Sequence, residues 1–371
     1  MKAVREIDSL NSLLRQKGQL RGAVVQGLDL SKAGVPWEEV DCEDAVFLGC
    51  GFPDGVGVEE LISKGATVFP AFPELPYEPY RPRLYSRKEL MEGWTEENDR
   101  SLDLRIYERF ATRGRKNPHV LEALAMRLHD HAIDDALADL LEGRVEKDGV
   151  KKVVGIMGGH SMGRGEEDFK RVARVAWSLA KEGYFVATGG GPGVMEAGNL
   201  GAYLAGESEE SLEWALSHLE AAPGYKDAGY ASLALDVIER FPAGVSSLAV
   251  PTWFYGHEPT NWFAQHVAKY FSNSLREDGL LAIATHGVIY ARGSAGTTQE
   301  VFMDACQNHY QTFEVISPMV FLGSDWFGER TGIFETVSRQ AGDKAYGRAL
   351  ALMDEVEACV DFLKAHPPTL V

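Results

Sequence analysis

The sequence predicts an α/β fold: a parallel sheet with helices on both faces, preceded by a smaller β-rich and helical N-terminal region. Two observations support this prediction. From Lys151 onward, short and continuously apolar segments alternate with helical patterns, as in parallel sheets that are buried on both faces. Glycine-rich turns follow three of these segments, at the strand ends where such sheets bind their ligands.

Composition narrows the class of protein. The 371 residues are 45% hydrophobic and 25% charged, and no apolar run is long enough to span a bilayer. The polar N-terminus lacks the apolar stretch of a secretory signal, so we expect a cytoplasmic protein. A formal net charge of −18 argues against a nucleic-acid partner, because nucleic-acid binders need a basic face. Four well-separated cysteines lack zinc-site spacing, and we expect no metal and no cofactor.

Residues 1–84 are predicted to form a β-rich region that ends in a proline-rich connector at 72–83. Residues 85–150 have a helical pattern. There His129 and His131 would point apart on a helix, which favours hydrogen-bonded structural histidines over a metal site. The expected N-terminal strands, each bounded by Gly or Pro, are Gly22–Gln26, Ala45–Gly49 and Ala66–Pro70.

Residues 151–371 are expected to form one sheet domain with a helical insertion at 207–244. A helix is predicted from Glu166 to Glu182, between the first two strands. The predicted strands of this domain are Val153–Met157, Tyr184–Thr188, Leu248–Pro251, Gly287–Ala291 and Met319–Leu322.

The glycine turns have two interpretations from spacing alone. They could line one ligand crevice, or their glycines could simply supply positive φ, with Pro192 at a first helical position. Thr297 and Glu300 likewise fit a capping box at a helix start. A dinucleotide site is disfavoured, because neither main turn reads G-x-G-x-x-G.

Two turns together resemble the LOG family of cytokinin-activating phosphoribohydrolases, once described as lysine decarboxylases. That family carries a triple-glycine turn with a further Gly and a Met, and the motif PGGxGTxxE. The first corresponds here to Gly189-Gly-Gly-Pro-Gly-Val-Met195 and the second to Arg292-Gly-Ser-Ala-Gly-Thr-Thr-Gln-Glu300. The resemblance extends over about Lys151 to Phe327, with Arg292 in place of proline and Ser294 in place of the second glycine.

The resemblance implies a Rossmann-like fold and hydrolysis of nucleoside 5′-monophosphates to a free base and ribose 5-phosphate. It implies Glu300 as the catalytic carboxylate and an upstream arginine, for which Arg276 is the candidate. Arg276 could instead form a surface ion pair with Glu277 and Asp278. By resemblance we also expect a homodimer or a larger homo-oligomer. The backbone amides expected to receive the 5′-phosphate are those of Gly293, Ser294, Ala295, Gly296 and Thr297.

Two further groups of residues are candidates for the rest of the nucleotide. Some of these residues also have a purely structural explanation. Glu196 could only stabilise the dipole of its helix, His160 could only cap its turn, and Trp253, Phe254 and Tyr255 could simply be buried. For the nucleotide and its ribose the candidates are Gly158, Gly159, His160, Gly189, Gly190, Gly191, Gly193 and Glu196. For the base they are Trp253, Phe254 and Tyr255.

Two functions from different classes follow. One is the phosphoribohydrolase, and the alternative is a non-catalytic nucleotide-binding sensor or regulatory protein that keeps the phosphate crevice. Glu300 favours the enzyme, because a pure binder has no chemical need for that carboxylate. Decarboxylation through pyridoxal phosphate is disfavoured, because neither glycine motif contains a lysine for a Schiff base.

Overall fold

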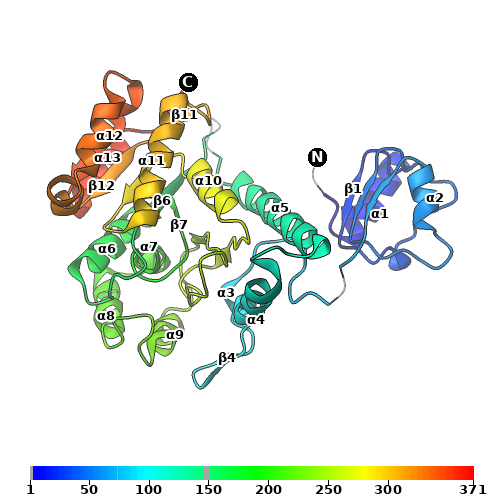
Figure 1. The fold of residues 1–371 in the computed structure, drawn as a ribbon, viewed down its shortest axis with the longest axis horizontal. Coiled ribbons are helices and arrows are strands. Elements are labelled where there is room, and N and C mark those ends of the chain that lie inside the picture. Colours follow the sequence, from blue (N-terminus) through cyan, green and yellow to red (C-terminus); the bar gives the residue numbers. More distant parts are fainter. Residues whose placement is uncertain (1–2, 73, 146–149) are drawn as a thin grey trace. The chain divides into compact units, whose positions relative to one another are not determined.

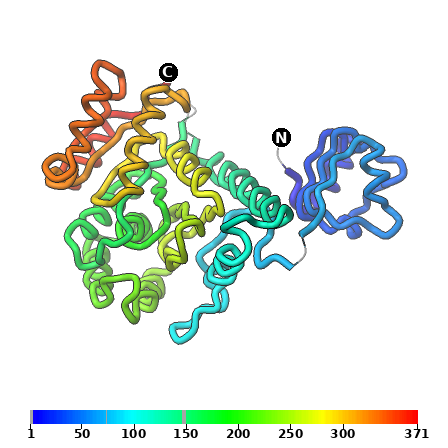
Figure 2. Tube along the Cα trace, in the orientation of Figure 1, coloured from blue at the N-terminus to red at the C-terminus, as the bar shows by residue number. Residues whose placement is uncertain are grey.

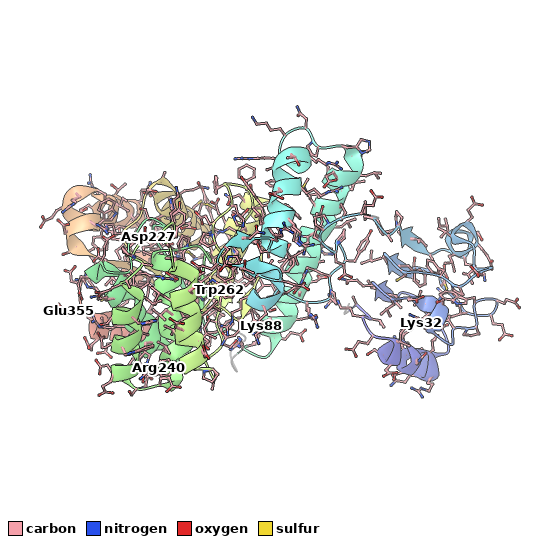
Figure 3. The ribbon with its side chains drawn as sticks, turned by 90° about the horizontal axis from the view of Figure 1, so that it is seen from below. Lys32, Lys88, Asp227, Arg240, Trp262 and Glu355 are labelled. Atoms are coloured by element: carbon pink, nitrogen blue, oxygen red, sulfur yellow. The ribbon has the colours of Figure 1, made fainter. Side chains whose placement is uncertain are left out.

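The computed structural model describes residues 3–72, 74–145 and 150–371 (Figure 1). These residues fall into two compact units. The N-terminal unit takes in the described residues of 1–83 together with 116–136, and the sheet unit takes in those of 84–115 and 137–371. The Cα trace in Figure 2 follows the chain through both. Within each unit, charged side chains such as Lys32, Arg240 and Glu355 are exposed (Figure 3).

The N-terminal unit contains a three-stranded parallel sheet in the order β1-β2-β3. The strands pack around Phe47, whose ring centroid lies 5.3 Å from that of Phe52. The three strands predicted here are confirmed, since each predicted segment contains one. Their bounds are Val24–Gln26 for β1, Val46–Leu48 for β2 and Thr67–Phe69 for β3, and the helices are α1 (Ile7–Lys17) and α2 (Val58–Ser63).

The proline-rich run 72–83 packs against this unit, and its Pro73 lies outside the described residues. Gln26 Nε2 donates to the carbonyl oxygens of Tyr80 and Arg81 at 3.0 and 3.1 Å. In the same unit His129 Nδ1 lies 3.2 Å from Asp130 Oδ1, whereas exposed His131 makes a separate ion pair. Across the described residues, no three His, Cys, Asp or Glu side chains form a group that could hold a metal ion.

The sheet unit is built on a seven-stranded sheet in the order β13-β12-β10-β6-β7-β8-β9, in which every neighbouring pair is parallel. The predicted α/β class with a parallel sheet is therefore confirmed, and its five predicted strands correspond to β6, β7, β8, β10 and β12. The bounds are β6 Val153–Met157, β7 Phe185–Thr188, β8 Leu248–Ala249, β9 His266–Val267, β10 Val288–Tyr290, β12 Met319–Leu322 and β13 Leu350–Met353.

The path of the chain through this sheet reverses once. It starts at β6, moves outward through β7, β8 and β9, and then returns to β10 on the other side of β6. Ile156 of β6 pairs with Ile289 of β10 across this point. Open α/β sheets bind ligands beyond the carboxyl ends of the strands where the order reverses. A ligand site is therefore expected beyond the carboxyl ends of β6 and β10.

Helices cover the sheet in two groups. In one, α6 contacts both α7 and α13, and in the other α11 contacts both α10 and α12. The helix predicted between the first two strands is confirmed as α6. The bounds are α6 Glu167–Lys181, α7 Val194–Tyr203, α10 Asn273–Ile283, α11 Ala295–Tyr310, α12 Ile333–Ala341 and α13 Val356–Ala365.

Two segments elaborate the sheet unit. The predicted insertion 207–244 contains two helices, and the segment 84–115 contains two more. Residues 146–149, at the end of the region predicted to be helical, lie outside the described residues. No helix in the described ranges is long and apolar enough to cross a membrane. These four helices are α3 (Arg87–Leu90), α4 (Leu102–Arg109), α8 (Glu209–Leu219) and α9 (Tyr230–Arg240), and a fifth helix, α5 (Val120–Glu142), lies outside both segments.

Candidate functional site

A cavity of about 580 Å³ lies in the sheet unit, at the carboxyl ends of five adjacent strands. It extends from the point where the strand order reverses toward the β9 edge of the sheet. Its volume is in the range of small-molecule sites. The lining comes from 294–297 after β10, 158–160 after β6, 189–190 after β7, 251–252 and 255–261 after β8, and Lys269 after β9.

The first and third glycine turns meet across the point of reversal. Gly159 N donates to the Arg292 carbonyl oxygen at 3.0 Å, and a Cβ at Gly159 would lie 3.2 Å from Gly293 Cα. Gly193, with a φ of +69°, brings the start of α7 against the Gly159–His160 backbone. These glycines are needed because their backbones approach too closely for side chains.

The N-terminus of α11 faces this cavity. The helix begins at Ala295 after Ser294, whose side chain makes no capping bond. The capping-box interpretation of Thr297 and Glu300 is therefore wrong, because both residues lie inside the helix. The first amides of an α-helix have no partner within it and carry a partial positive charge, so this end suits an anion. Arg292, which stands where the LOG motif has proline, makes ion pairs with Glu166 and Asp168 of the α6 region.

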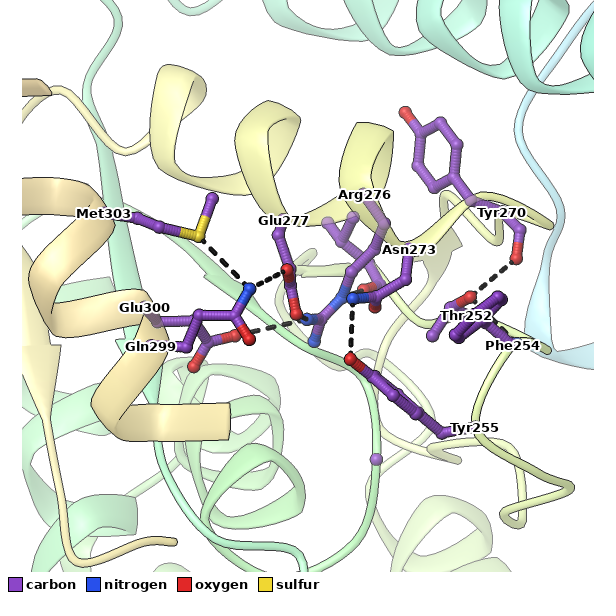
Figure 4. A network of polar contacts seen from close by, with 12 residues as sticks. Thr252, Phe254, Tyr255, Tyr270, Asn273, Arg276, Glu277, Gln299, Glu300 and Met303 are labelled. Atoms are coloured by element: carbon purple, nitrogen blue, oxygen red, sulfur yellow. Dashed lines mark hydrogen bonds and ion pairs between the residues drawn. The ribbon is translucent and has the colours of Figure 1, made fainter. Parts of the chain in front are cut away.

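Arg276 of α10 and Glu300 of α11 form a buried ion pair in the cavity wall (Figure 4). Arg276 Nη1 donates to Glu300 Oε1 at 3.2 Å, and Arg276 Nε donates to the Val250 carbonyl oxygen at 2.8 Å. The two residues are only 9% and 7% exposed. The alternative interpretation of Arg276 as a surface ion pair is therefore wrong. A Cβ at Gly189 would clash with Arg276 Nη2 and would lie 2.7 Å from Met195 Sδ, so the triple-glycine turn leaves room for the guanidinium.

A second carboxylate lies close to this pair. Glu277 Oε1 is 3.8 Å from Arg276 Nη1, and Gln299 Nε2 donates to Glu277 Oε2 at 2.7 Å. Burial raises the pKa of Glu300, the Arg276 charge lowers it, and the Glu277 charge raises it further, with a net upward shift. Glu300 therefore holds a proton more readily than an ordinary glutamate, which suits a group that exchanges protons with substrate or water.

The predicted aromatic residues have different positions. Tyr255 lines the cavity, is 65% exposed and accepts a hydrogen bond from Asn273 Nδ2 at 3.0 Å (Figure 4). Trp253 is fully buried, and its Nε1 donates to Asp103 Oδ1 at 2.7 Å. Phe254 is exposed but lies outside the cavity lining. Tyr255 is thus the aromatic residue of the three that a ligand in the cavity would meet.

Glu196 lies in a buried network outside the lining. Arg164 donates to both of its carboxylate oxygens, and the Tyr230 hydroxyl donates to Oε2 at 2.6 Å. These bonds join α7 to α9 and occupy the carboxylate that was a candidate for ribose. The predicted residues that line the cavity are Gly158, Gly159, His160, Gly189, Gly190, Tyr255, Arg276, Ser294, Ala295, Gly296, Thr297 and Glu300. Those outside the lining are Gly191, Gly193, Glu196, Trp253, Phe254 and Gly293.

The β9 end of the cavity contains a polar cluster that no sequence motif predicted. We define the Asp103 cluster as Asp103, Trp253, His257, Thr260 and Lys269. Asp103 of α4 is fully buried, and Lys269 Nζ lies 2.7 Å from its Oδ1 and 2.9 Å from its Oδ2. Burial by itself would raise the pKa of Asp103, but the Lys269 charge and His257 outweigh it and lower that pKa. Asp103 therefore favours its charged form.

Comparisons with known proteins concern part of the chain. No curated protein matches the sequence. One solved structure, the molybdenum cofactor binding protein from the phototrophic bacterium Rippkaea orientalis, aligns with a TM-score of 0.34 and 16% identity, over 57% of this chain and 95% of that one. Residues 151–208 match the model of the SLOG cluster4 family. This chain is therefore similar to the SLOG cluster4 family over β6, α6, β7 and α7, the part of the sheet unit that carries the first two glycine turns.

Proposed function

We propose that this protein is a nucleoside 5′-monophosphate phosphoribohydrolase, which hydrolyses the N-glycosidic bond to give a free base and ribose 5-phosphate. The observation that carries the proposal is the buried Arg276–Glu300 pair in the same cavity as the N-terminus of α11. The partial match to the SLOG cluster4 family supports a nucleotide-related role. By likeness to the LOG family, the proposal includes a homodimer or larger homo-oligomer, and it places the protein in the cytoplasm.

The 5′-phosphate binds at the start of α11 in this proposal. The amides of Ser294, Ala295, Gly296 and Thr297 belong to the N-cap and the first turn of α11, and all four residues line the cavity. Such amides hold a phosphate without any cationic side chain, which fits the acidic composition of the chain. Binding energy from the phosphate, which does not react, positions the sugar at the reacting centre.

The reaction then takes place beside Glu300. Water attacks C1′ and gives a proton to the Glu300 carboxylate, while the bond from C1′ to the base nitrogen breaks and its electron pair leaves with the base. The base nitrogen then takes up a proton, which balances the one released by water and returns Glu300 to its carboxylate form. The negative carboxylate stabilises the oxocarbenium character that develops on the ribose. Arg276 holds Glu300 through its Nη1 bond and keeps a guanidinium near the leaving group or phosphate.

The first test is to incubate the purified protein with a panel of nucleoside monophosphates and to measure free base and ribose 5-phosphate. We expect Glu300→Gln to lower the rate by about 10²-fold or more, the usual size of a lost general base. Glu357→Gln on α13 is the matched control, because Glu357 is an exposed glutamate in a helix remote in sequence from the cavity loops. It should leave the rate unchanged.

Binding of a monophosphate without release of its base would favour the alternative function. If no monophosphate releases its base while one still raises the melting temperature, the protein is the non-catalytic nucleotide sensor instead. The Ser294 substitution in the second motif favours that alternative, because a side chain narrows the turn where the LOG motif has glycine.

A further inference from the structure

We infer that Lys269 recognises the base at the far end of the cavity and selects monophosphates whose base presents a carbonyl oxygen over those that present an amino group there. This inference rests on the proposed function and specifies its substrate class. The contact residues are Lys269, which lines the cavity, and the buried Asp103 that holds it.

The order of the strands defines the two ends of the cavity. The loops that line it follow β10, β6, β7, β8 and β9, which are adjacent in that order. Adjacent strands lie about 4.8 Å apart, so the loops after β10 and β9 are separated by four strand spacings, roughly 19 Å. The N-terminus of α11 lies at one end and Lys269 at the other.

The Arg276–Glu300 pair lies between these ends. Arg276 bonds to the Val250 carbonyl oxygen just after β8 and to Glu300 on α11, so its guanidinium bridges the β8 and β10 sides of the cavity. A monophosphate with its phosphate at α11 and its C1′ beside Glu300 therefore directs its base toward the β9 end. There the wall is made by Lys269, Thr260 and His257.

Lys269 presents a hydrogen-bond donor to that base. An ammonium group has three donors and no acceptor. Its contacts with the two Asp103 oxygens use two of these donors, and the side chain is only 4% exposed, with the cavity as its neighbour. The remaining N–H has a base carbonyl oxygen as its natural partner.

The Asp103 carboxylate cannot act as an acceptor for the base. Its Oδ1 accepts from Trp253 Nε1 and Lys269, and its Oδ2 accepts from Thr260 Oγ1 at 3.0 Å and from Lys269. The other carboxylate on this side, Glu258, lies at the β7 turn, where its Oε2 would be 2.7 Å from a Cβ on Gly191. An amino group at Lys269 would therefore face a donor, and the remaining N–H of Lys269 would be left unpaired.

Two pairs of nucleotides isolate this contact. Inosine and adenosine monophosphates differ in the exocyclic group at position 6 of the purine, and uridine and cytidine monophosphates differ in the one at position 4 of the pyrimidine. We expect the oxo member of each pair to bind at least about tenfold more tightly, the cost of an unpaired buried donor. Titration calorimetry on the full chain with Glu300→Gln measures binding without turnover.

The variant that tests the contact is Asp103→Asn with Lys269→Met in the Glu300→Gln background. Lys269→Met alone would leave Asp103 as an unpaired buried charge and threaten folding, whereas the double change keeps the site neutral. We expect the oxo preference to disappear while both members of each pair still bind. Lys344→Met, at an exposed lysine, is the control and should keep the preference.

Three outcomes would contradict the inference. Equal or tighter binding of the adenosine and cytidine monophosphates by the Glu300→Gln protein overturns it, whatever the double variant does. So does a preference that persists in a folded double variant, judged by its melting temperature. Both leave the proposed function standing. Failure of all four nucleotides to bind overturns the proposed function and this inference together.

Discussion

At the scale of single residues, a second buried carboxyl group lies one helical turn beyond Glu300. Asp304 accepts hydrogen bonds from the Tyr290 hydroxyl at 2.8 Å and from Asn308 Nδ2 at 3.1 Å. Burial raises the pKa of Asp304 from 3.8 to about 7, against the opposing effect of the Tyr290 bond. Its charge therefore changes within the range in which most proteins are assayed.

This shift predicts how stability depends on pH. The folded state keeps the Asp304 proton after the unfolded chain has released it, so the free energy of unfolding falls as pH rises from about 4 to about 7 and levels off above. The full effect of a three-unit shift is about 4 kcal/mol. Asp304→Asn should remove this slope, which urea unfolding at pH 5 and pH 8 measures. An unchanged difference between the two pH values in the variant would contradict the assignment.

Some site residues could be predicted from the sequence and others could not. Glu300, Arg276 and Ser294–Thr297 carry a motif whose order along the chain matches the geometry, so resemblance was enough to bring them together as a prediction. The Asp103 cluster has no such signal, because Asp103 and Lys269 are 166 residues apart. For Glu196 the sequence predicted a role that the structure does not support. Its position one turn into a helix suggested a contact with ribose, but Arg164 binds its carboxylate outside the cavity lining.

At the scale of elements, the crossing of α6 and α7 depends on one glycine. A Cβ at Gly201 would lie 2.8 Å from the carbonyl carbon of Ala173 and 2.9 Å from Trp177 N, and these are backbone atoms of α6. Backbone within a helix cannot give way as a flexible side chain can. The helices therefore have to move apart if residue 201 gains a side chain.

We expect Gly201→Ala to lower the free energy of unfolding by about 2 kcal/mol, the usual cost of overpacking a core. Gly279→Ala is the matched control, because Gly279 is also inside a helix and has open space where its Cβ would be. It should raise stability by about 0.5–1 kcal/mol through helix propensity. Urea unfolding of both variants measures the difference, and equal effects would contradict the close crossing.

The elements that the sequence did not predict share a physical feature. β6, β7 and β12 are buried along their whole length, so their apolar runs were visible. β9 has only two residues, and β13 is mostly half-buried at the edge of the sheet. Short or edge strands have no continuous apolar run, and their pairing depends on neighbours that are distant in the chain.

At the scale of the whole molecule, the chain offers a spectroscopic probe for each unit. Trp37 is the single tryptophan of the N-terminal unit, and the other six belong to the sheet unit. The cavity is lined only by residues of the sheet unit. A ligand that binds there stabilises the unit it contacts.

Saturating nucleoside monophosphate should therefore raise the melting temperature of the sheet unit and leave the melting temperature of the N-terminal unit unchanged. Comparing the fluorescence melting curves of the wild type and Trp37→Phe separates the two signals. The same upward shift in the Trp37 signal would show that both units unfold as one cooperative body and would contradict this prediction.

The fold class could be predicted from the sequence, but the contacts between the segment 84–115 and the insertion 207–244 could not. Glu96, from the segment 84–115, accepts a hydrogen bond from Gly229 N at 3.0 Å and also bonds to Ser232. The segment before the sheet thus meets the insertion within it. Such contacts between a turn and the start of a distant helix leave no periodic pattern, because each residue involved occurs only once.

The partnership of Asp103 with a lysine 166 residues downstream also bears on how the protein is made. A ribosome that adds about 5–20 residues per second needs roughly 10–30 s to travel from one to the other. During that interval α4 has emerged with a carboxylate whose counterion has not yet been synthesised. Asp103 therefore stays hydrated in the nascent chain, and the β9 end of the cavity closes late in synthesis, after β9 has joined the edge of the sheet.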